Sequence, residues 1–177
     1  MKLVILDRDG VINFDSDSLI KSPAEWRAIP GSLEAIAQLN HAGYHVVLAT
    51  NQSGVGRGLF EVSTLNAIHD KMHRALAQIG GRIDAIFFCP HANDAGCNCR
   101  KPRSGLLDEI ASRFNVALKG VPCVGDALRD LQAAAAVGAT PILVRTGKGV
   151  RTEEAGGLPE GTRIYDDLAA AARAIQR

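Results

Sequence analysis

The sequence is short of aromatic residues, of net charge and of long apolar runs, and each shortage counts against a class of protein. Aromatic residues make up 5% of the 177 residues, which is low for a surface that stacks nucleic-acid bases. The 20 basic and 19 acidic residues give a net charge of +1, so no strong field attracts nucleic acid or an anionic membrane. Apolar runs such as 133–137 and 142–144 are far shorter than the roughly 20 residues that span a bilayer. We therefore expect neither nucleic acid nor a membrane among its partners.

Several catalytic and sorting signals are missing as well. The chain contains no Gly-x-Ser-x-Gly and no phosphate-binding loop ending in Gly-Lys-Ser/Thr, which argues against serine hydrolases and P-loop kinases. The glycine-rich stretch 54–58 is followed by Leu59 where a dinucleotide fingerprint has its third glycine. The four apolar residues 3–6 are too short a run for a secretory signal peptide, so we expect a cytoplasmic location.

Short apolar runs alternate with segments of helical period along the whole chain. This alternation is typical of a doubly wound α/β fold, in which helices cover both faces of a mainly parallel sheet. No repeat or linker divides the chain, so we predict a single domain over 1–177, without a large cap domain. Strands are expected at 3–6, 46–49, 83–88, 121–124, 142–144 and around Ile164. Helices are expected from a cap at Ser32 to Gly43, from a cap at Ser63 to Gly80, over 106–114 and 128–137, and from Leu168.

Polar residues directly follow several predicted strands, at the edge where open parallel sheets bind ligands. Asp7 and Asp9 follow the first strand, and their spacing can bring both carboxylates near one point while Gly10 allows a sharp turn. One carboxylate can attack a phosphoryl group while the other moves protons. Asp7 and Asp126, at another strand end, can share a Mg²⁺ ion that neutralises the phosphate charge. The alternative is that Asp-x-Asp-Gly is a capped turn.

Two further segments carry groups that suit a phosphate. Thr50 offers a hydroxyl and Asn51 an amide at the end of the second strand, and Lys101 offers a cation. Each of these residues alone is common in turns or on surfaces. Their convergence with the carboxylates on one edge of the sheet favours a phosphate-handling site.

In chain order, Asp7-Arg8-Asp9-Gly10-Val11, Thr50-Asn51, Lys101-Pro102 and Gly125-Asp126 resemble the four motifs of the haloacid dehalogenase superfamily of phosphatases. The resemblance covers essentially the whole chain. It implies that Asp7 is the nucleophile, that Asp9 is the general acid and then the base, and that Thr50 and Lys101 stabilise the transferred phosphoryl group. It also implies that the side chains of Asp7 and Asp126 and the backbone carbonyl of Asp9 hold Mg²⁺.

Three of the four cysteines cluster in Cys89-x-His91 and, five residues later, Cys97-x-Cys99. In a chain long enough to bury a good core, clustered thiols indicate metal ligands more than a disulfide scaffold. Three thiolates and one imidazole form a closed tetrahedral set for a structural zinc ion. The alternative is three unrelated thiols near a histidine. Since Lys101 follows two residues after Cys99, zinc would fix the loop that delivers this lysine.

With this zinc loop, the chain resembles two families of the superfamily, the bacterial heptose bisphosphate phosphatases and the related histidinol-phosphate phosphatases. The stretches 51–54, 57–58 and 145–148 look more like the heptose family, and the five-residue gap inside the zinc loop looks more like the histidinol family. The resemblance to the heptose family implies removal of the 7-phosphate of D-glycero-D-manno-heptose 1,7-bisphosphate, in heptose and lipopolysaccharide precursor synthesis, by a monomer. The implied substrate contacts are Asp15, Ser16, Asp17, Ser18, Thr50, Asn51, Gln52, Ser53, Arg57, Arg100 and Lys101.

Other interpretations remain open from the residues themselves. A non-catalytic zinc module would keep the fold without the chemistry, but the intact carboxylates and the low net charge count against it. A polynucleotide end-phosphatase would require a basic groove that the charge count does not suggest. His69 and His73 share a helix face without an evident third ligand, and we expect that face to be solvated.

Overall fold

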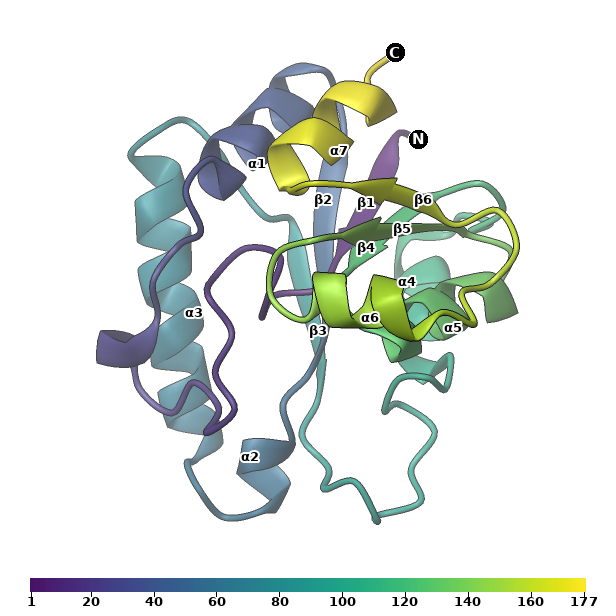
Figure 1. Ribbon diagram of the computed structural model, residues 1–177. Coiled ribbons are helices and arrows are strands. Elements are labelled where there is room, and N and C mark those ends of the chain that lie inside the picture. The colour runs from purple at the N-terminus through teal and green to yellow at the C-terminus, as the bar shows by residue number, and fades with distance from the viewer.

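The computed structural model describes residues 1–177 and contains one six-stranded sheet in which every neighbouring pair of strands is parallel (Figure 1). The strand order is β3-β2-β1-β4-β5-β6, so the chain winds outward from β1 in both directions. This arrangement confirms the predicted α/β fold. The strands are β1 (Leu3–Leu6), β2 (His45–Asn51), β3 (Ala85–Cys89), β4 (Pro122–Gly125), β5 (Thr140–Val144) and β6 (Arg163–Tyr165).

Helices cover both faces of this sheet (Figure 1). The helices α1, α3 and α7 pack on one face, and α4 and α5 pack on the other. Three short helices, η1, α2 and α6, were not expected, because segments of three to seven residues show no full helical period. The helices are η1 (Pro23–Glu25), α1 (Ser32–His41), α2 (Ser53–Gly56), α3 (Val62–Ala77), α4 (Gly105–Phe114), α5 (Leu128–Ala136), α6 (Gly149–Ala155) and α7 (Leu168–Ile175).

Alternation along β1 explains why the sheet needs both layers. Val4 and Leu6 belong to the hydrophobic cluster under α1, α3 and α7, whereas Leu3 and Ile5 belong to the cluster under α4 and α5. All four side chains are buried, as expected for a strand in the middle of a parallel sheet. The sheet is therefore held between two apolar layers, and polar groups gather at its edges and strand ends.

Both predicted helix caps are wrong. Gly31 is the N-cap of α1, and Ser32 is its first residue, with its hydroxyl donating to the carbonyl of Val11 at 2.8 Å. Ser32 thus ties the loop after β1 to the helix instead of capping it. The helix α3 begins one residue before Ser63, with Glu61 as N-cap, and neither Glu61 nor Gly31 caps its helix through a side-chain hydrogen bond to the backbone.

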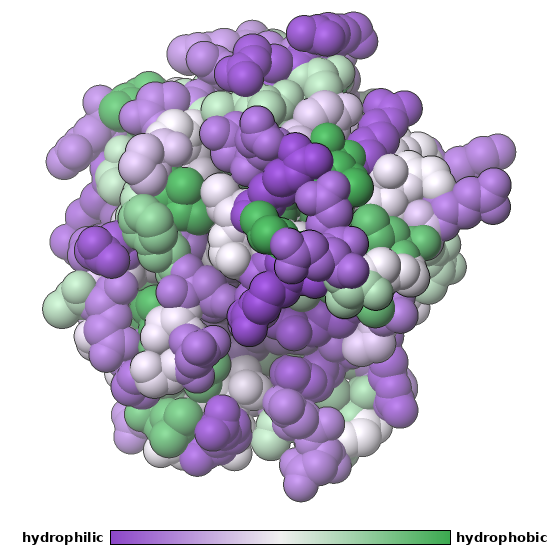
Figure 2. Space-filling view, viewed as in Figure 1, coloured by the Kyte–Doolittle hydropathy of each residue, from purple (hydrophilic) through white to green (hydrophobic).

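Only short insertions follow the first two strands, as expected for a fold without a large cap domain. The loop after β1 contains η1, and α2 follows β2 (Figure 1). Hydrophilic residues cover most of the face in Figure 2, and hydrophobic residues lie on it in small separate groups. None of the helices has both the length and the apolar character that crossing a bilayer requires.

Candidate active site

A polar cavity opens at the carboxyl ends of the central strands, beside the point where the strand order changes direction. Parallel sheets bind ligands at this point because the loops after neighbouring strands diverge there. Only one of its 14 lining residues, Leu19, is hydrophobic. The predicted site residues that line it are Asp7, Asp9, Asp15, Asn51, Gln52, Ser53, Arg57, Arg100, Lys101 and Asp126.

Four predicted substrate contacts do not line this cavity. Ser16, Asp17 and Ser18 line neighbouring depressions formed by the loop after β1. Thr50 is buried, and its hydroxyl accepts a hydrogen bond from Gln52 Nε2 at 3.0 Å. The structure thus places Thr50 behind Gln52, which itself lines the cavity.

Lys101 and two aspartates form a buried charge cluster in this site. Lys101 Nζ lies 3.2 Å from Asp7 Oδ1 and 2.7 Å from Asp130 Oδ1, and it donates to the carbonyl of Ala49 at 2.6 Å. Burial alone would lower the pKa of Lys101, but the carboxylates of Asp130 and Asp7 outweigh it and raise the pKa. Lys101 is therefore a fixed cation beside the candidate nucleophile.

Three carboxylates lie together in the site, and the cations of the protein do not fully neutralise their negative charge. Ligand oxygens of Asp7, Asp126 and Asp130 lie within 4.8 Å of one another. Burial and then repulsion by Asp130 raise the pKa of Asp7 to about 6, and the same causes, with Asp7 added, raise that of Asp126 to about 8. A divalent cation would hold these groups ionised, and a hard oxygen donor set of this kind fits Mg²⁺.

The loop after β5 fixes the position of Asp126. The backbone N–H of Lys148 donates to Asp126 Oδ2 at 2.9 Å, and the Thr146 hydroxyl donates to the carbonyl of Gly10 at 2.6 Å. Gly147 has a positive φ of 57°, and a Cβ there would meet Asp126 Oδ2 at 2.3 Å and the backbone of Gly10 at 2.5 Å. Only glycine allows this loop to lie against both carboxylate-bearing turns.

Replacing Gly147 with Ala is expected to displace Asp126 and to weaken activation by Mg²⁺ roughly tenfold to a hundredfold, as when a partner that orients a metal ligand is lost. Titration of phosphate release with Mg²⁺ measures this change. Gly120→Ala is the matched control, because Gly120 has a φ of 75° with no atom within 4 Å of a built Cβ, so it reports backbone strain alone. Equal Mg²⁺ requirements in the two variants would contradict the bracing role of Gly147.

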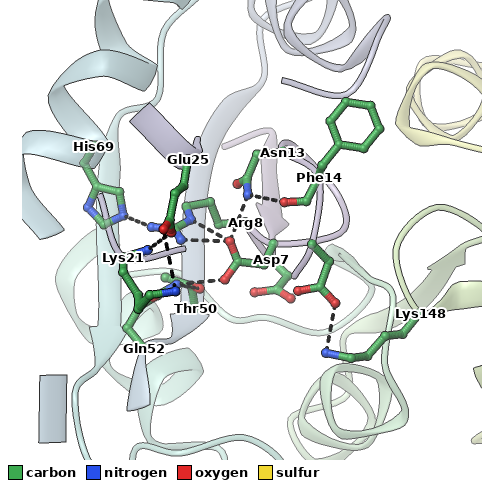
Figure 3. Close-up of polar contacts among 12 residues, drawn as sticks. Asp7, Arg8, Asn13, Phe14, Lys21, Glu25, Thr50, Gln52, His69 and Lys148 are labelled. Carbon is green, nitrogen blue, oxygen red and sulfur yellow. Dashed lines mark hydrogen bonds and ion pairs between the residues drawn. The ribbon is translucent and has the colours of Figure 1, made fainter. Parts of the chain in front are cut away.

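Three side chains, those of Arg8, Asn13 and Gln52, converge in the site (Figure 3), and each donates a hydrogen bond to the carboxylate of Asp9. Arg8 Nε and Nη2 donate to its Oδ1 at 3.0 and 2.8 Å, and Asn13 Nδ2 donates to the same oxygen at 2.9 Å. Gln52 Nε2 donates to Oδ2 at 3.2 Å. Burial would raise the pKa of Asp9, but Arg8 and these hydrogen bonds outweigh it and lower the pKa. Asp9 is therefore a carboxylate when the cavity holds no substrate.

The predicted zinc ligands lie together. Ligand atoms of Cys89, His91, Cys97 and Cys99 are within 4.8 Å of one another, with His91 Nδ1 3.1 Å from Cys99 Sγ and Cys89 Sγ 3.6 Å from Cys97 Sγ. Burial raises the pKa of the Cys89 thiol, so a cation is needed to hold it as a thiolate. Three sulfurs and one imidazole nitrogen in one cluster fit a closed zinc site.

This cluster lies next to Lys101 in the chain, and hydrogen bonds hold the loop between them. The Lys101 backbone N–H donates to Asn51 Oδ1 at 3.0 Å, and Asn51 Nδ2 donates to the carbonyl of Lys101 at 3.2 Å. Arg103 Nη1 donates to the carbonyls of Gly96 and Cys97 at 3.1 and 2.7 Å. The loop is thus fixed at the cysteine cluster on one side and at the end of β2 on the other.

Three arginines line the cavity without forming an ion pair to an acidic side chain, and they are Arg57, Arg100 and Arg129. Arg100 Nη1 is buried without a hydrogen-bond partner, and burial together with Arg129 lowers the pKa of Arg100. Arg129 lines the same cavity and makes no ion pair. Burial would lower the pKa of Arg129, but the charges of Asp130 and Asp7 outweigh it and raise the pKa. Arg100 is therefore the arginine whose buried N–H group is left to bind an anionic ligand.

The sequence interpretation missed several residues of the site and misplaced one histidine. Asp130 escaped notice although it follows Asp126 by four residues, within the first turn of α5. His69 was expected in solvent but is 6% exposed, because it lies on the face of α3 that packs on the sheet. The sequence interpretation also missed four lining residues: Arg129 lies in the first turn of α5, and Leu19, Asn93 and Lys148 come from irregular loops without any sequence period.

Comparison with known proteins identifies the family that the chain matches. Residues 98–171 match the HAD-hydrolase-like family model. The chain is 65% identical over 175 residues to a D-glycero-beta-D-manno-heptose-1,7-bisphosphate 7-phosphatase of Bordetella bronchiseptica, covering 99% of this chain and 98% of that relative. It is 55% identical to the protein of the same name from Pseudomonas putida, covering 99% of both.

Solved structures give the same result. A crystal structure of D,D-heptose 1,7-bisphosphate phosphatase from B. bronchiseptica complexed with magnesium and phosphate matches with a TM-score of 0.98 and 65% identity, over 99% of this chain and 98% of that one. The D,D-heptose 1,7-bisphosphate phosphatase from Burkholderia thailandensis matches with a TM-score of 0.80 and 59% identity, over 98% and 97% of the two chains.

Proposed function

Since the chain belongs to the haloacid dehalogenase-like hydrolases, in the family of D-glycero-β-D-manno-heptose-1,7-bisphosphate 7-phosphatases, we propose that it removes the 7-phosphate of this sugar bisphosphate. It is a magnesium-dependent phosphoric monoester hydrolase of heptose metabolism. The observation that carries the proposal is the pairing of Lys101 with Asp7 in a cavity that also holds Asp126, together with 65% identity along nearly the whole chain.

The unpaired cations explain why a bisphosphate suits the cavity. A substrate with one phosphate needs only the charges around Asp7. Arg100 would remain without a counterion in that case, whereas a second phosphate on the sugar gives it one, with Arg57 and Arg129 in the same cavity. Histidinol phosphate instead carries an ammonium group, which these arginines would repel.

In the first half of the reaction, Asp7 attacks the phosphorus atom and the bond to the sugar oxygen breaks. Asp9 gives its proton to that oxygen, and the product is an aspartyl phosphate on Asp7. Lys101 neutralises charge on the phosphoryl oxygens, and Thr50 contributes by holding Gln52 in place. The negative charge of the arriving substrate opposes the effect of Arg8 and favours the protonated form of Asp9.

In the second half, Asp9 accepts a proton from a water molecule, which attacks the phosphorus and releases inorganic phosphate from Asp7. The hydrogen bonds to Asp9 that lower its pKa suit this step, because they favour the carboxylate. Asp7 and Asp126 would hold Mg²⁺, with the Asp9 backbone carbonyl, and the ion would neutralise the phosphoryl charge that otherwise repels Asp7.

Phosphate release from heptose 1,7-bisphosphate and from histidinol phosphate, measured side by side with Mg²⁺, tests the proposed substrate. We expect kcat/KM to favour the bisphosphate by at least about a hundredfold, since each charge-assisted contact contributes roughly 1.5–3 kcal/mol. Chelation with EDTA should abolish release and added Mg²⁺ should restore it. A preference for histidinol phosphate would contradict the proposal and leave only a phosphatase of small phosphoesters.

Two further properties belong to the same proposal. We also propose that the protein acts as a monomer, since the carboxylates, the lysine and the arginines that the proposed reaction uses are all present in a single copy of the chain. A cytoplasmic location fits the cysteine cluster, since thiols stay available as metal ligands in a reducing compartment.

A further inference from the structure

Arg8 has the largest fully buried side chain in the protein, and it lies directly behind the candidate acid–base residue. A buried cation is costly unless its charge is paired and its N–H groups are hydrogen-bonded. Asp9 is its ion-pair partner, through Nε and Nη2. The third nitrogen, Nη1, lies 3.1 Å from His69 Nε2 on α3 (Figure 3).

This contact fixes the chemical state of His69. A guanidinium group has no acceptor, so Arg8 must donate and His69 Nε2 must present its lone pair. The ring is then neutral, with its proton on Nδ1. Burial and the charge of Arg8 favour the same state, because they lower the pKa of His69 to about 3. His69 is not among the residues that line the cavity, and its contact with the site runs through Arg8 alone.

The hydrogen bonds to Asp9 are divided unequally between its two oxygens. Oδ1 accepts from Arg8 twice and from Asn13 once, whereas Oδ2 accepts only from Gln52. A carboxylate oxygen has two lone pairs, so Oδ1 is saturated and Oδ2 keeps one free. Oδ2 is therefore the oxygen that can give and take a proton in the cavity. Loss of the Arg8 contacts would let the carboxylate rotate and exchange the two oxygens.

The geometry points to Arg8 and His69 as a positioning pair, in which His69 anchors the Arg8 guanidinium and Arg8 holds Asp9 with Oδ2 directed to proton transfer. This inference rests on the proposed function, because it concerns the same acid–base residue. Neither member touches the substrate. The pair extends the active site to α3, a helix that contributes nothing to the cavity itself.

Three variants of α3 test the pair. His69→Leu removes the acceptor and is expected to lower kcat roughly tenfold to a hundredfold, the usual cost of a misplaced catalytic group, with KM changed less than about twofold. His69→Gln places an amide oxygen where Nε2 was and should keep kcat within about threefold of the wild type. His73→Leu, on the exposed side of the same helix, should behave as the wild type.

The assay measures heptose 1,7-bisphosphate and p-nitrophenyl phosphate in parallel, at a temperature well below each variant's Tm. A wild type that hydrolyses only p-nitrophenyl phosphate would contradict the proposed sugar substrate, and the positioning test would proceed on the second compound. If His69→Leu does not fold, His69→Asn replaces it, because its shorter amide does not reach Arg8. Wild-type kcat in the folded Leu or Asn variant, or equal losses in that variant and His69→Gln, would overturn the positioning role.

Discussion

Replacing Asp7 with Asn is expected to lower kcat for phosphate release by roughly four to six powers of ten, as when a catalytic nucleophile is removed. The amide has nearly the same volume as the carboxyl group but forms no acyl phosphate, so the reaction stops at its first step. Lys101 keeps its ion pair with Asp130 at 2.7 Å, so no buried cation is left unpaired.

The stability of the Asp7→Asn variant is expected to equal or exceed that of the wild type at pH 7 without Mg²⁺. Burial and Asp130 raise the pKa of Asp7 to about 6 in the folded protein, above the ordinary aspartate value of 3.8. A carboxyl group with a raised pKa loses folding stability as the pH rises between these two values, because the unfolded state releases its proton in this range while the folded state still holds one. The amide does not titrate, so this loss disappears.

Acid quenching after a brief reaction with labelled substrate tests whether a phosphate becomes covalently bound to Asp7. The wild type should carry labelled phosphate on Asp7, and Asp7→Asn should carry none. Asp94→Asn is the matched control, because Asp94 is exposed in the zinc loop and does not line the cavity. Activity above about a tenth of the wild type in folded Asp7→Asn would exclude Asp7 as the nucleophile.

The sequence predicted best what depends on backbone periodicity and strand ends. Asp7 and Asp126 were predicted in one place because parallel strands deliver their carboxyl ends to one edge, and the cavity lies there. What the sequence could not predict is the direction in which a side chain points. Thr50 follows the same rule as Asn51, yet its hydroxyl lies against Gln52 and outside the cavity lining.

The burial of His69 on α3 could be predicted in part from the sequence. His69 stands four residues after Leu65 and three before Met72, so it belongs to the apolar stripe of α3. That spacing indicates burial, and a buried histidine needs a hydrogen-bond partner. What the spacing does not contain is the identity of that partner, because Arg8 is 61 positions away in sequence. Such long-range pairs follow only from the packing of α3 on the sheet.

Replacing Cys99 with Ser is expected to remove zinc, to lower Tm by roughly ten degrees and to reduce kcat at least about tenfold. Loss of a structural zinc ion removes folding free energy, and a few kcal/mol correspond to about this shift in a chain of this size. Activity falls as well because Lys101 follows two residues later and depends on the loop for its position beside Asp7. Metal analysis, calorimetry and phosphate release on the same preparation measure the three effects.

Cys123→Ala provides the control, since Cys123 is buried in β4 and lies outside the ligand cluster. It should lower Tm modestly through lost packing while zinc content and kcat stay at wild-type values. The two variants therefore separate the loss of a buried thiol from the loss of the metal. A Cys99→Ser protein that retains a full equivalent of zinc, or that loses zinc while Tm and kcat stay unchanged, would show that the cluster does not hold the Lys101 loop in place.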